Sequence, residues 1–309
     1  MNEALTDPVH QYHAFGLNIA SEVDLPFTVL RPPSKQPDIT VQCGHLPHFP
    51  GRNDDDTQIQ ANKEKLLSSI PLFRYYVADG CQVRYPSSFK SRKENDKRAL
   101  IEVSFMILFM QRGCVMLHGS AVDIHGKAAV FMGDGGSGKS TAAAFLHQQG
   151  YDLLGDDTCV ITLKDGRPYV VPFCLHQKLN PDSARMLQLN SGRLNREPDE
   201  EKFLVQVPQK VTQHPIPLGN IYALQPSDTA QIDLLPLKGI DKIEVLFKNL
   251  QIRHLFDKAG LTDELMQNVF TLTQAAHVIR LLRPKTVFKG EKFVASIVND
   301  IQRRNQAPV

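Results

Sequence analysis

Short runs of strand-forming residues, separated by glycine and proline, characterise the first part of the chain. Residues 38–42 alternate between apolar and polar side chains, and residues 73–77 are rich in aromatic and β-branched residues. The stretch 87–98 is almost entirely polar and has the composition of a linker or loop. The pattern therefore predicts a small, mostly β domain over residues 1–98.

The pattern of apolar and polar positions changes at residue 99, where a dense apolar stretch of helical length begins. Strands are then expected at residues 119–124 and 128–132, followed by a helix at 140–149. Alternation of strands and helices is typical of domains in which helices pack on a sheet. We therefore expect an α/β domain over residues 99–309.

The last part of the chain has mainly helical periodicity. Apolar residues recur at helical spacing between residues 261 and 302, with an interruption at Pro284. The pattern predicts helices on both sides of that proline.

The length of 309 residues suits two domains. A formal charge of +2 does not favour nucleic acid or an anionic membrane as a partner. The start lacks a basic region followed by an apolar stretch, and the longest apolar run, residues 105–110, is too short to span a bilayer.

Five scattered cysteines without a C-x-x-C argue against a disulfide framework and a zinc ribbon. A cytoplasmic protein is expected.

The sequence Gly-Asp-Gly-Gly-Ser-Gly-Lys-Ser at residues 133–140 matches the phosphate-binding pattern G-x-x-x-x-G-K-[ST] at every fixed position. Glycines let successive N–H groups point at one phosphate, Lys139 reaches the β- and γ-phosphates, and Ser140 offers its hydroxyl to Mg²⁺. An apolar strand before it and an Ala-rich helix after it argue against an ordinary glycine-rich turn. The residues expected to bind a nucleoside triphosphate here are Gly133, Asp134, Gly135, Gly136, Ser137, Gly138, Lys139, Ser140 and Thr141.

A pair of aspartates, Asp156 and Asp157, follows a strand expected at residues 151–154. If that strand is a parallel neighbour of the strand before the loop, both carboxylates reach the edge of the sheet where phosphates would bind. Adjacent side chains on a strand point to opposite sides, so one can serve Mg²⁺ while the other faces an acceptor. The alternative is a solvated turn, in which Asp-Asp is common. His118 is a further candidate, although a lone histidine is more often packed or simply exposed.

Three motifs together resemble, in their order and spacing, the catalytic core of the HPr kinase/phosphorylase family. They are His118 with the glycine that follows it, the glycine-rich loop, and an element in which a small residue precedes two aspartates. The resemblance implies the P-loop kinase fold that this family shares with phosphoenolpyruvate carboxykinases. It also implies that Asp156 is the base that takes the acceptor's proton and that Asp157 joins Ser140 on Mg²⁺. His118 would support the site near Asp156, and Lys139 would complete the catalytic set.

The HPr kinase-like serine kinases of ribosomal-peptide pathways, which include lasso peptide kinases, are more similar still. Their amino-terminal unit opens with a phrase like residues 12–26 (YHAFGLNIASEVDLP). After the Asp pair they continue with a proline and a Lys-Leu, here Pro172 and Lys178-Leu179. The resemblance makes Lys178 a candidate contact for a phosphate or for the acceptor; an exposed lysine at the end of a strand is the alternative.

The leading hypothesis is an ATP- and Mg²⁺-dependent kinase that phosphorylates a serine hydroxyl of a peptide or small protein, which the resemblance narrows to a lasso peptide precursor. Residues 1–98 are then the candidate for acceptor recognition. A second hypothesis takes a small-molecule hydroxyl such as free serine as the acceptor. A third is an NTP-binding regulator, against which the Asp pair argues because a switch protein needs no general base. A homo-oligomer and a phosphorylase activity are left open.

Overall fold

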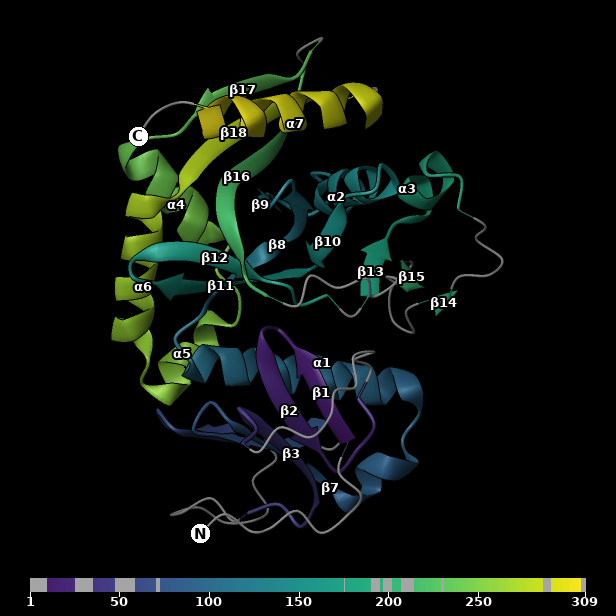
Figure 1. The fold of residues 1–309 in the computed structure, drawn as a ribbon, viewed down its shortest axis with the longest axis vertical. Coiled ribbons are helices and arrows are strands. Elements are labelled where there is room, and N and C mark those ends of the chain that lie inside the picture. The colour runs from purple at the N-terminus through teal and green to yellow at the C-terminus, as the bar shows by residue number, and fades with distance from the viewer. Residues whose placement is uncertain are drawn as a thin grey trace. The chain divides into compact units, whose positions relative to one another are not determined.

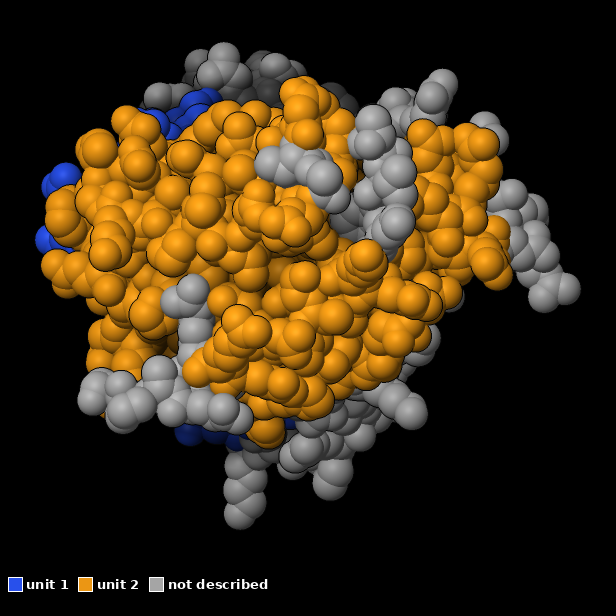
Figure 2. All heavy atoms as spheres, turned by 90° about the horizontal axis from the view of Figure 1, so that it is seen from above, with its two compact units in different colours: residues 1–114, 252–267 blue, residues 115–251, 268–309 orange. Residues whose placement is uncertain are grey.

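The computed structural model, drawn in Figure 1, describes residues 10–25, 36–47, 59–70, 73–174, 176–189, 195–196, 202–206, 214–228, 231–285 and 290–306. Pro26, the last residue of the amino-terminal phrase, lies outside these ranges. The chain forms two compact units, coloured blue and orange in Figure 2. The first comprises Met1–Cys114 and Ile252–Gln267, and the second Val115–Gln251 and Asn268–Val309. The division thus falls after Cys114, whereas the sequence pattern predicts a boundary at residue 98.

Within the described residues, the first unit is built on a seven-stranded sheet in the order β1-β2-β3-β7-β6-β5-β4. The strands are β1 (His10–Ala14), β2 (Leu17–Ser21), β3 (Ile39–Gly44), β4 (Ile59–Ala61), β5 (Lys65–Ile70), β6 (Phe73–Ala78) and β7 (Gln82–Pro86). β3 pairs in parallel with β2 and β7, and the other neighbours are antiparallel. The two strands predicted in this region are β3 and β6.

The polar stretch after β7 is not a linker. It forms a 3-10 helix, Ser87–Ser91, and the first turns of α1 (Glu94–Gln111). Those turns are exposed, while farther along α1 the buried ring of Phe105 packs edge-on against Phe15 at 5.8 Å. The linker prediction was wrong because a helix with an exposed first turn carries the same polar residues as a loop. No helix of the described residues is long and apolar enough to cross a membrane.

Helices and strands alternate in the second unit, as the sequence predicts for an α/β domain. Its strands are β8 (Val115–Ile124), β9 (Lys127–Met132), β10 (Asp152–Gly155), β11 (Thr158–Lys164), β12 (Arg167–Val171), β13 (His176–Leu179), β14 (Asn195–Arg196), β15 (Phe203–Gln206), β16 (Ile216–Ser227), β17 (Asp233–Pro236) and β18 (His277–Pro284). Its helices are α2 (Lys139–Gln148), α3 (Pro181–Met186), α4 (Gly239–Lys248) and α7 (Gly290–Gln306). The remaining helices are α5 (Arg253–Ala259), in the first unit, and α6 (Thr262–Ala275), which continues from the first unit into the second. The predicted α/β class is confirmed.

The strand order of the second unit determines which strand ends share an edge. β9 pairs antiparallel with β8 and parallel with β16, and β16 pairs parallel with β18. β10 is antiparallel to β8, which therefore lies between β10 and β9. β10 is thus not a direct neighbour of β9, the arrangement considered from the sequence. It nevertheless runs in the same direction, so the carboxyl ends of β9, β10, β16 and β18 lie at one edge of the sheet.

Strand β18 corrects the prediction of a mainly helical tail. Residues 277–284 form a strand between β16 and β17, with Leu281 and Ile279 fully buried. A short apolar run inside a larger helical pattern cannot be assigned by periodicity alone. Pairing with β16 over its whole length decides its conformation.

A hydrophobic core lies between the sheet and the helices α2 and α7, which pack together. The ring of Phe131 on β9 stacks on Tyr222 of β16 at 5.6 Å and lies 5.9 Å from Phe293 of α7. All three rings are buried. Burial of apolar side chains stabilises the fold, and Ala142, Ala143 and Leu146 of α2 belong to the same core as Phe131, so the core holds β9 and α2 on either side of the loop that joins them.

Candidate active site

A glycine-rich loop joins β9 to α2. Gly133 and Gly138 have φ angles of 139° and 102°, in the region that favours glycine. A Cβ atom at Gly133 would lie 2.5 Å from the carbonyl oxygen of Leu224 on β16, so no larger residue fits between the loop and that strand. The strand–loop–helix context that the phosphate-binding motif requires is therefore present, with the positive end of α2 at the loop.

The loop is also held by Arg283, at the end of β18. Its Nε donates to the carbonyl oxygen of Ser137 at 2.8 Å, and its Nη2 to that of Gly136 at 3.4 Å. A Cβ atom at Gly138 would lie 3.3 Å from Nε, so glycine gives the guanidinium room to approach. Because these loop carbonyls accept hydrogen bonds from Arg283, the backbone conformation is fixed from outside the motif.

Lys139 and Ser140 begin α2 at the end of the loop. Lys139 is buried, and its Nζ donates to the carbonyl oxygens of Gly133 at 2.8 Å and Asp134 at 3.2 Å. Burial lowers the pKa of Lys139, and the nearby carboxylates, led by Asp157, oppose this effect. The ammonium thus lies beside the loop, where it can bind phosphate oxygens.

Asp156 follows β10 and is only 5% exposed. Its Oδ1 accepts a hydrogen bond from Oγ of Ser120 at 2.6 Å, and its Oδ2 accepts one from the backbone N–H of Lys178 at 2.7 Å. Burial raises the pKa of Asp156 to about 6, although the hydrogen bonds from Ser120, Lys178 and Ser140 act in the opposite direction. A carboxyl group with a pKa near 6 is mostly ionised at neutral pH and can still take up a proton.

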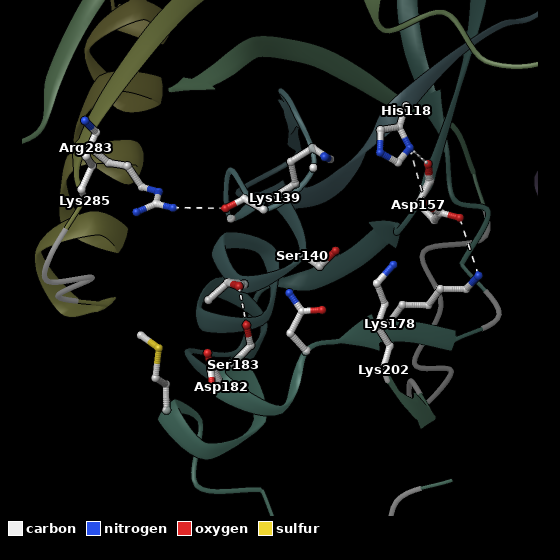
Figure 3. A pocket seen from close by; sticks show the side chains of 16 residues that line it. His118, Lys139, Ser140, Asp157, Lys178, Asp182, Ser183, Lys202, Arg283 and Lys285 are labelled. Carbon is white, nitrogen blue, oxygen red and sulfur yellow. Dashed lines mark hydrogen bonds and ion pairs between the residues drawn. The ribbon is translucent and has the colours of Figure 1, made fainter. Parts of the chain in front are cut away.

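Asp157 has a left-handed backbone, with φ of 65°, and its side chain is 39% exposed. Its Oδ1 lies 3.4 Å from Nδ1 of His118, and its Oδ2 lies 3.7 Å from Nζ of Lys178 (Figure 3). The two carboxylates therefore splay, as expected for adjacent residues at the end of a strand. The resemblance implies His118 near Asp156, whereas the ring of His118 contacts Asp157 and the Gln251 side chain.

A cavity of about 670 Å³ opens in front of the glycine-rich loop. Figure 3 shows the side chains that line it, with His118 and Asp157 near one end and Arg283 and Lys285 near the other. Among the described residues, its walls carry the cationic side chains of Lys139, Lys178, Lys202, Arg283 and Lys285, against the carboxylates of Asp157 and Asp182. A cavity with this excess of positive charge suits a polyphosphate. Asp156 does not line it.

The other predicted loop residues differ in how they relate to the cavity. Gly135, Gly136 and Gly138 line it, as does Thr141, whose hydroxyl lies 2.6 Å from that of Ser183 on α3. Asp134 instead pairs with Lys248 at 2.6 Å, and this contact lowers the pKa of the exposed Asp134 carboxyl. Ser137 is buried in the loop itself.

The residues present fit a magnesium ion. Ser140 and Asp157 both line the cavity, and hydroxyl and carboxylate oxygens are donors that Mg²⁺ accepts. Among the described residues, no three His, Cys, Asp or Glu side chains come together as a metal site. Mg²⁺ does not require such a cluster, because it commonly binds one or two protein oxygens together with substrate phosphates and water.

The sequence patterns do not indicate four residues that form hydrogen bonds to the candidate site: Ser120, Asn249, Gln251 and Arg283. The segment after α4 runs along the first residues of β8, where His118 N–H donates to the carbonyl oxygen of Asn249 at 2.7 Å. The side chain of Asn249 accepts a hydrogen bond from the N–H of Gly133 at 3.3 Å. No local pattern marks these residues, because their roles come from pairings between distant parts of the chain.

No protein-family model and no curated protein matches this chain. Among solved structures, it is similar to the HPr(Ser) kinase/phosphatase from Coxiella burnetii at 12% sequence identity. The match covers 62% of this chain and 90% of that chain, with a TM-score of 0.33. A TM-score this low does not support an argument about function.

Proposed function

We propose that this protein is an ATP- and Mg²⁺-dependent kinase that transfers the γ-phosphoryl group to a hydroxyl. The observation that carries the proposal is the cavity in which Lys139, Ser140 and Asp157 meet at the end of a glycine-rich loop. A cation for the phosphates, a hydroxyl and a carboxylate for Mg²⁺, and a helix amino terminus are the parts that phosphoryl transfer requires.

The loop and its lysine bind the triphosphate. Loop N–H groups and Lys139 contact the phosphate oxygens. The remaining cations of the cavity compensate the negative charge of the phosphates. Bound Mg²⁺ would neutralise the charge that develops on the phosphates, with Ser140 and Asp157 as its protein ligands. The positive end of α2, which begins directly after the loop, would stabilise the same charge.

The acceptor loses a proton in the reaction. The hydroxyl oxygen forms a bond to the γ-phosphorus, the bond to the β–γ bridging oxygen breaks, and ADP departs with that electron pair. We propose that Asp156 takes the proton, because its raised pKa of about 6 suits a base that works near neutral pH. The carboxylate lies within hydrogen-bonding reach of Ser140, a residue of the cavity wall.

The greater exposure of Asp157 favours the reverse assignment of the two aspartates, with Asp157 as the base and Asp156 near the metal. Asp157 lines the cavity and Asp156 does not, so Asp157 could meet the acceptor while Asp156 acts on Mg²⁺ through Ser140. The two assignments are separated by Asp156→Asn and Asp157→Asn. The variant that loses the base should bind Mg·ATP normally and lose turnover by roughly 10²- to 10⁴-fold. The variant that loses the metal ligand should require a higher Mg²⁺ concentration.

We propose a serine of a peptide or small protein as the acceptor, more narrowly a lasso peptide precursor, with the amino-terminal unit in acceptor recognition. This proposal is supported by the resemblance of the motifs and of the amino-terminal phrase to lasso peptide kinases. Free serine is the small-molecule alternative, and an NTP-binding regulator is the non-catalytic one. A cytoplasmic location is proposed from the scattered cysteines, all five of which lie in the described residues and form no disulfide there.

The test is transfer of phosphate from Mg·ATP to candidate peptides encoded beside this protein's gene, followed by mass spectrometry. The expected result is the addition of one phosphate to a serine, which is lost with Lys139→Ala. Transfer to free serine but to none of the peptides would favour the small-molecule alternative. ATP hydrolysis without any phosphorylated product would support the regulator and overturn the proposal.

A further inference from the structure

One apolar side chain interrupts the polar wall of the cavity. Among the described residues that line it, Met186 alone is apolar, and each of the others is a glycine or carries a polar or charged side chain. Met186 is 43% exposed and is the last residue of the short helix α3. Isolated exposed apolar residues are common on protein surfaces, so exposure by itself assigns no role. The position of Met186 in the cavity wall is therefore the feature that bears on function.

The helix α3 is held against α2, the helix that follows the glycine-rich loop. Oγ1 of Thr141 in the first turn of α2 lies 2.6 Å from Oγ of Ser183 on α3. At the other end of α2, Nε2 of Gln148 donates to the carbonyl oxygen of Leu187 at 3.3 Å. Ser183 and Met186 are three residues apart on one helix, so they share a face, and both line the cavity. The wall formed by α3 thus has a fixed position beside the first turn of α2.

The cavity has two chemically different ends. In Figure 3, Ser140 lies between Asp157 on one side and Asp182 of α3 on the other. Arg283 and Lys285 also lie on the side of α3. This end therefore combines cations with a carboxylate and an apolar side chain. Such a mixture suits a ligand that has both a charged part and an uncharged part.

The direction of a bound nucleotide follows from the residues that would hold Mg²⁺. In phosphate-binding loops of this kind the lysine reaches the β- and γ-phosphates, and Mg²⁺ bridges the same two groups. Ser140 and Asp157, the proposed ligands of Mg²⁺, therefore mark the γ end of the triphosphate. The acceptor approaches the γ-phosphorus from the side opposite the departing ADP, because the attacking and leaving oxygens are roughly in line. The nucleoside then extends from Ser140 away from Asp157, which is towards α3.

We propose that the nucleoside lies along α3 with its base against the side chain of Met186. This assignment rests on the proposed function, and it names the part of the site that binds the nucleoside. The faces of a nucleobase are flat and apolar, and a thioether makes favourable contacts with aromatic rings. An unbranched and polarizable side chain adapts to the shape of its partner. Met186 thus favours a nucleoside triphosphate over a bare polyphosphate.

Calorimetric titration of the full chain with Mg·ATP and with magnesium tripolyphosphate tests the assignment. Tripolyphosphate has three linked phosphates and no nucleoside. Met186→Ala is expected to weaken binding of Mg·ATP about two- to tenfold and to leave binding of tripolyphosphate unchanged. Met186→Leu keeps an apolar side chain and should retain most of the affinity for Mg·ATP. Lys139→Ala should weaken binding of both ligands, because the ammonium contacts phosphates in each.

Ile240→Ala is the matched control, because Ile240 is 65% exposed on α4 and is not among the described residues that line the cavity. Both affinities should persist in it. Equal affinities of wild type and Met186→Ala for Mg·ATP would overturn the assignment alone. An equal loss for both ligands would also overturn it, since Met186 would then act through the loop. A wild-type protein that binds neither ligand would reject the proposed function and the assignment together.

Oxidation of Met186 gives an independent measurement. Hydrogen peroxide converts an accessible methionine thioether to the sulfoxide and is itself reduced to water. Saturating Mg·ATP is expected to slow oxidation of Met186 severalfold, whereas saturating magnesium tripolyphosphate is not, as read by mass spectrometry of peptides. The half-buried Met266 of α6 is the internal reference and should react at one rate throughout. Oxidation of Met186 at an unchanged rate in the presence of bound ATP would contradict the assignment, even if no acceptor is ever phosphorylated.

Discussion

Ser120 on β8 donates a 2.6 Å hydrogen bond to Asp156, and both side chains are buried. The bond joins β8 to the residue that directly follows β10, its antiparallel neighbour, and involves a carboxyl group in the interior. Burial outweighs the stabilising effect of this bond on the charged form, because the pKa of Asp156 is raised to about 6. The ionised carboxylate therefore destabilises the fold at neutral pH.

The sign of this effect gives a prediction for stability against pH. The pKa of Asp156 is higher in the folded state than in the unfolded state. The stability of the protein with a protonated Asp156 is therefore fully present below the unfolded pKa of 3.8 and is lost as pH rises through about 6. The free energy of unfolding of Asp156→Asn relative to wild type should therefore increase by roughly 2–3 kcal/mol between pH 4 and pH 8. Urea denaturation at several pH values measures it. The exposed Asp165→Asn is the control, and a flat difference for Asp156→Asn would contradict the burial argument.

The pH dependence of activity follows from the same group if Asp156 is the base. Protonation removes the acceptor of the hydroxyl's proton, so the proposed kinase should lose kcat/KM as pH falls through about 6. Assays between pH 5 and pH 8 with saturating Mg²⁺ check this. The acidic limb should disappear from the residual activity of Asp156→Asn, and its persistence there would assign the limb to another group.

Lys139→Ala is expected to weaken binding of Mg·ATP. The ammonium lies against the loop, 2.8 Å from the carbonyl oxygen of Gly133, and loss of its charge-assisted hydrogen bonds to the phosphates should cost about ten- to a hundredfold in affinity. Isothermal titration calorimetry gives the value. Lys238→Ala, which removes an exposed lysine outside the cavity, should leave the affinity unchanged. Equal affinities of the two variants would exclude Lys139 from the binding site.

Two glycines of the loop provide a matched pair for stability. A Cβ at Gly133 would lie 2.5 Å from the carbonyl oxygen of Leu224, and its φ of 139° disfavours other residues. Gly133→Ala should lower the free energy of unfolding by about 1–3 kcal/mol or more. A Cβ at Gly135 would meet nothing within 4 Å, so Gly135→Ala should change it by no more than about 0.5 kcal/mol. Similar losses for both would show that the loop is not held as described.

Two phenylalanines test the core in the same way. Phe293 of α7 is 1% exposed and packs near Phe131, whereas Phe270 of α6 is 57% exposed. Phe293→Ala should lower the free energy of unfolding by about 3–5 kcal/mol. Phe270→Ala should change it by no more than about 0.5 kcal/mol. Urea denaturation of the two variants under identical conditions gives both values.

Local patterns predicted the elements whose formation depends on nearby residues. The strand before the glycine-rich loop, the helix after it and the strand before Asp156 are β9, α2 and β10. The patterns failed where distant pairing decides. β18 was expected to be helical, and its conformation comes from pairing with β16. The start of α1 was expected to be a linker, because an exposed helical turn and a loop share a polar composition.

In the candidate site too, some residues follow from local motifs and others from distant pairing. The positions of Lys139, Ser140 and Asp157 follow from a contiguous motif and from the direction of β10, and the structure places all three on one cavity. Gln251 and Arg283 could not be found from sequence, because glutamine and arginine carry no signal until their hydrogen-bond partners are known. Likewise, the hydroxyl that donates to buried Asp156 belongs to Ser120, which precedes it by 36 residues.

The hydrogen bond from Arg283 to Ser137 spans 146 residues of chain. During translation the complete phosphate-binding motif therefore leaves the ribosome long before the guanidinium that fixes its carbonyls is synthesised. A nascent chain that ends before β18, or a cloned fragment of that length, holds every residue of the motif and lacks both this arginine and the sheet edge beside it. The motif marks where the site will form; the carboxy-terminal strand completes it.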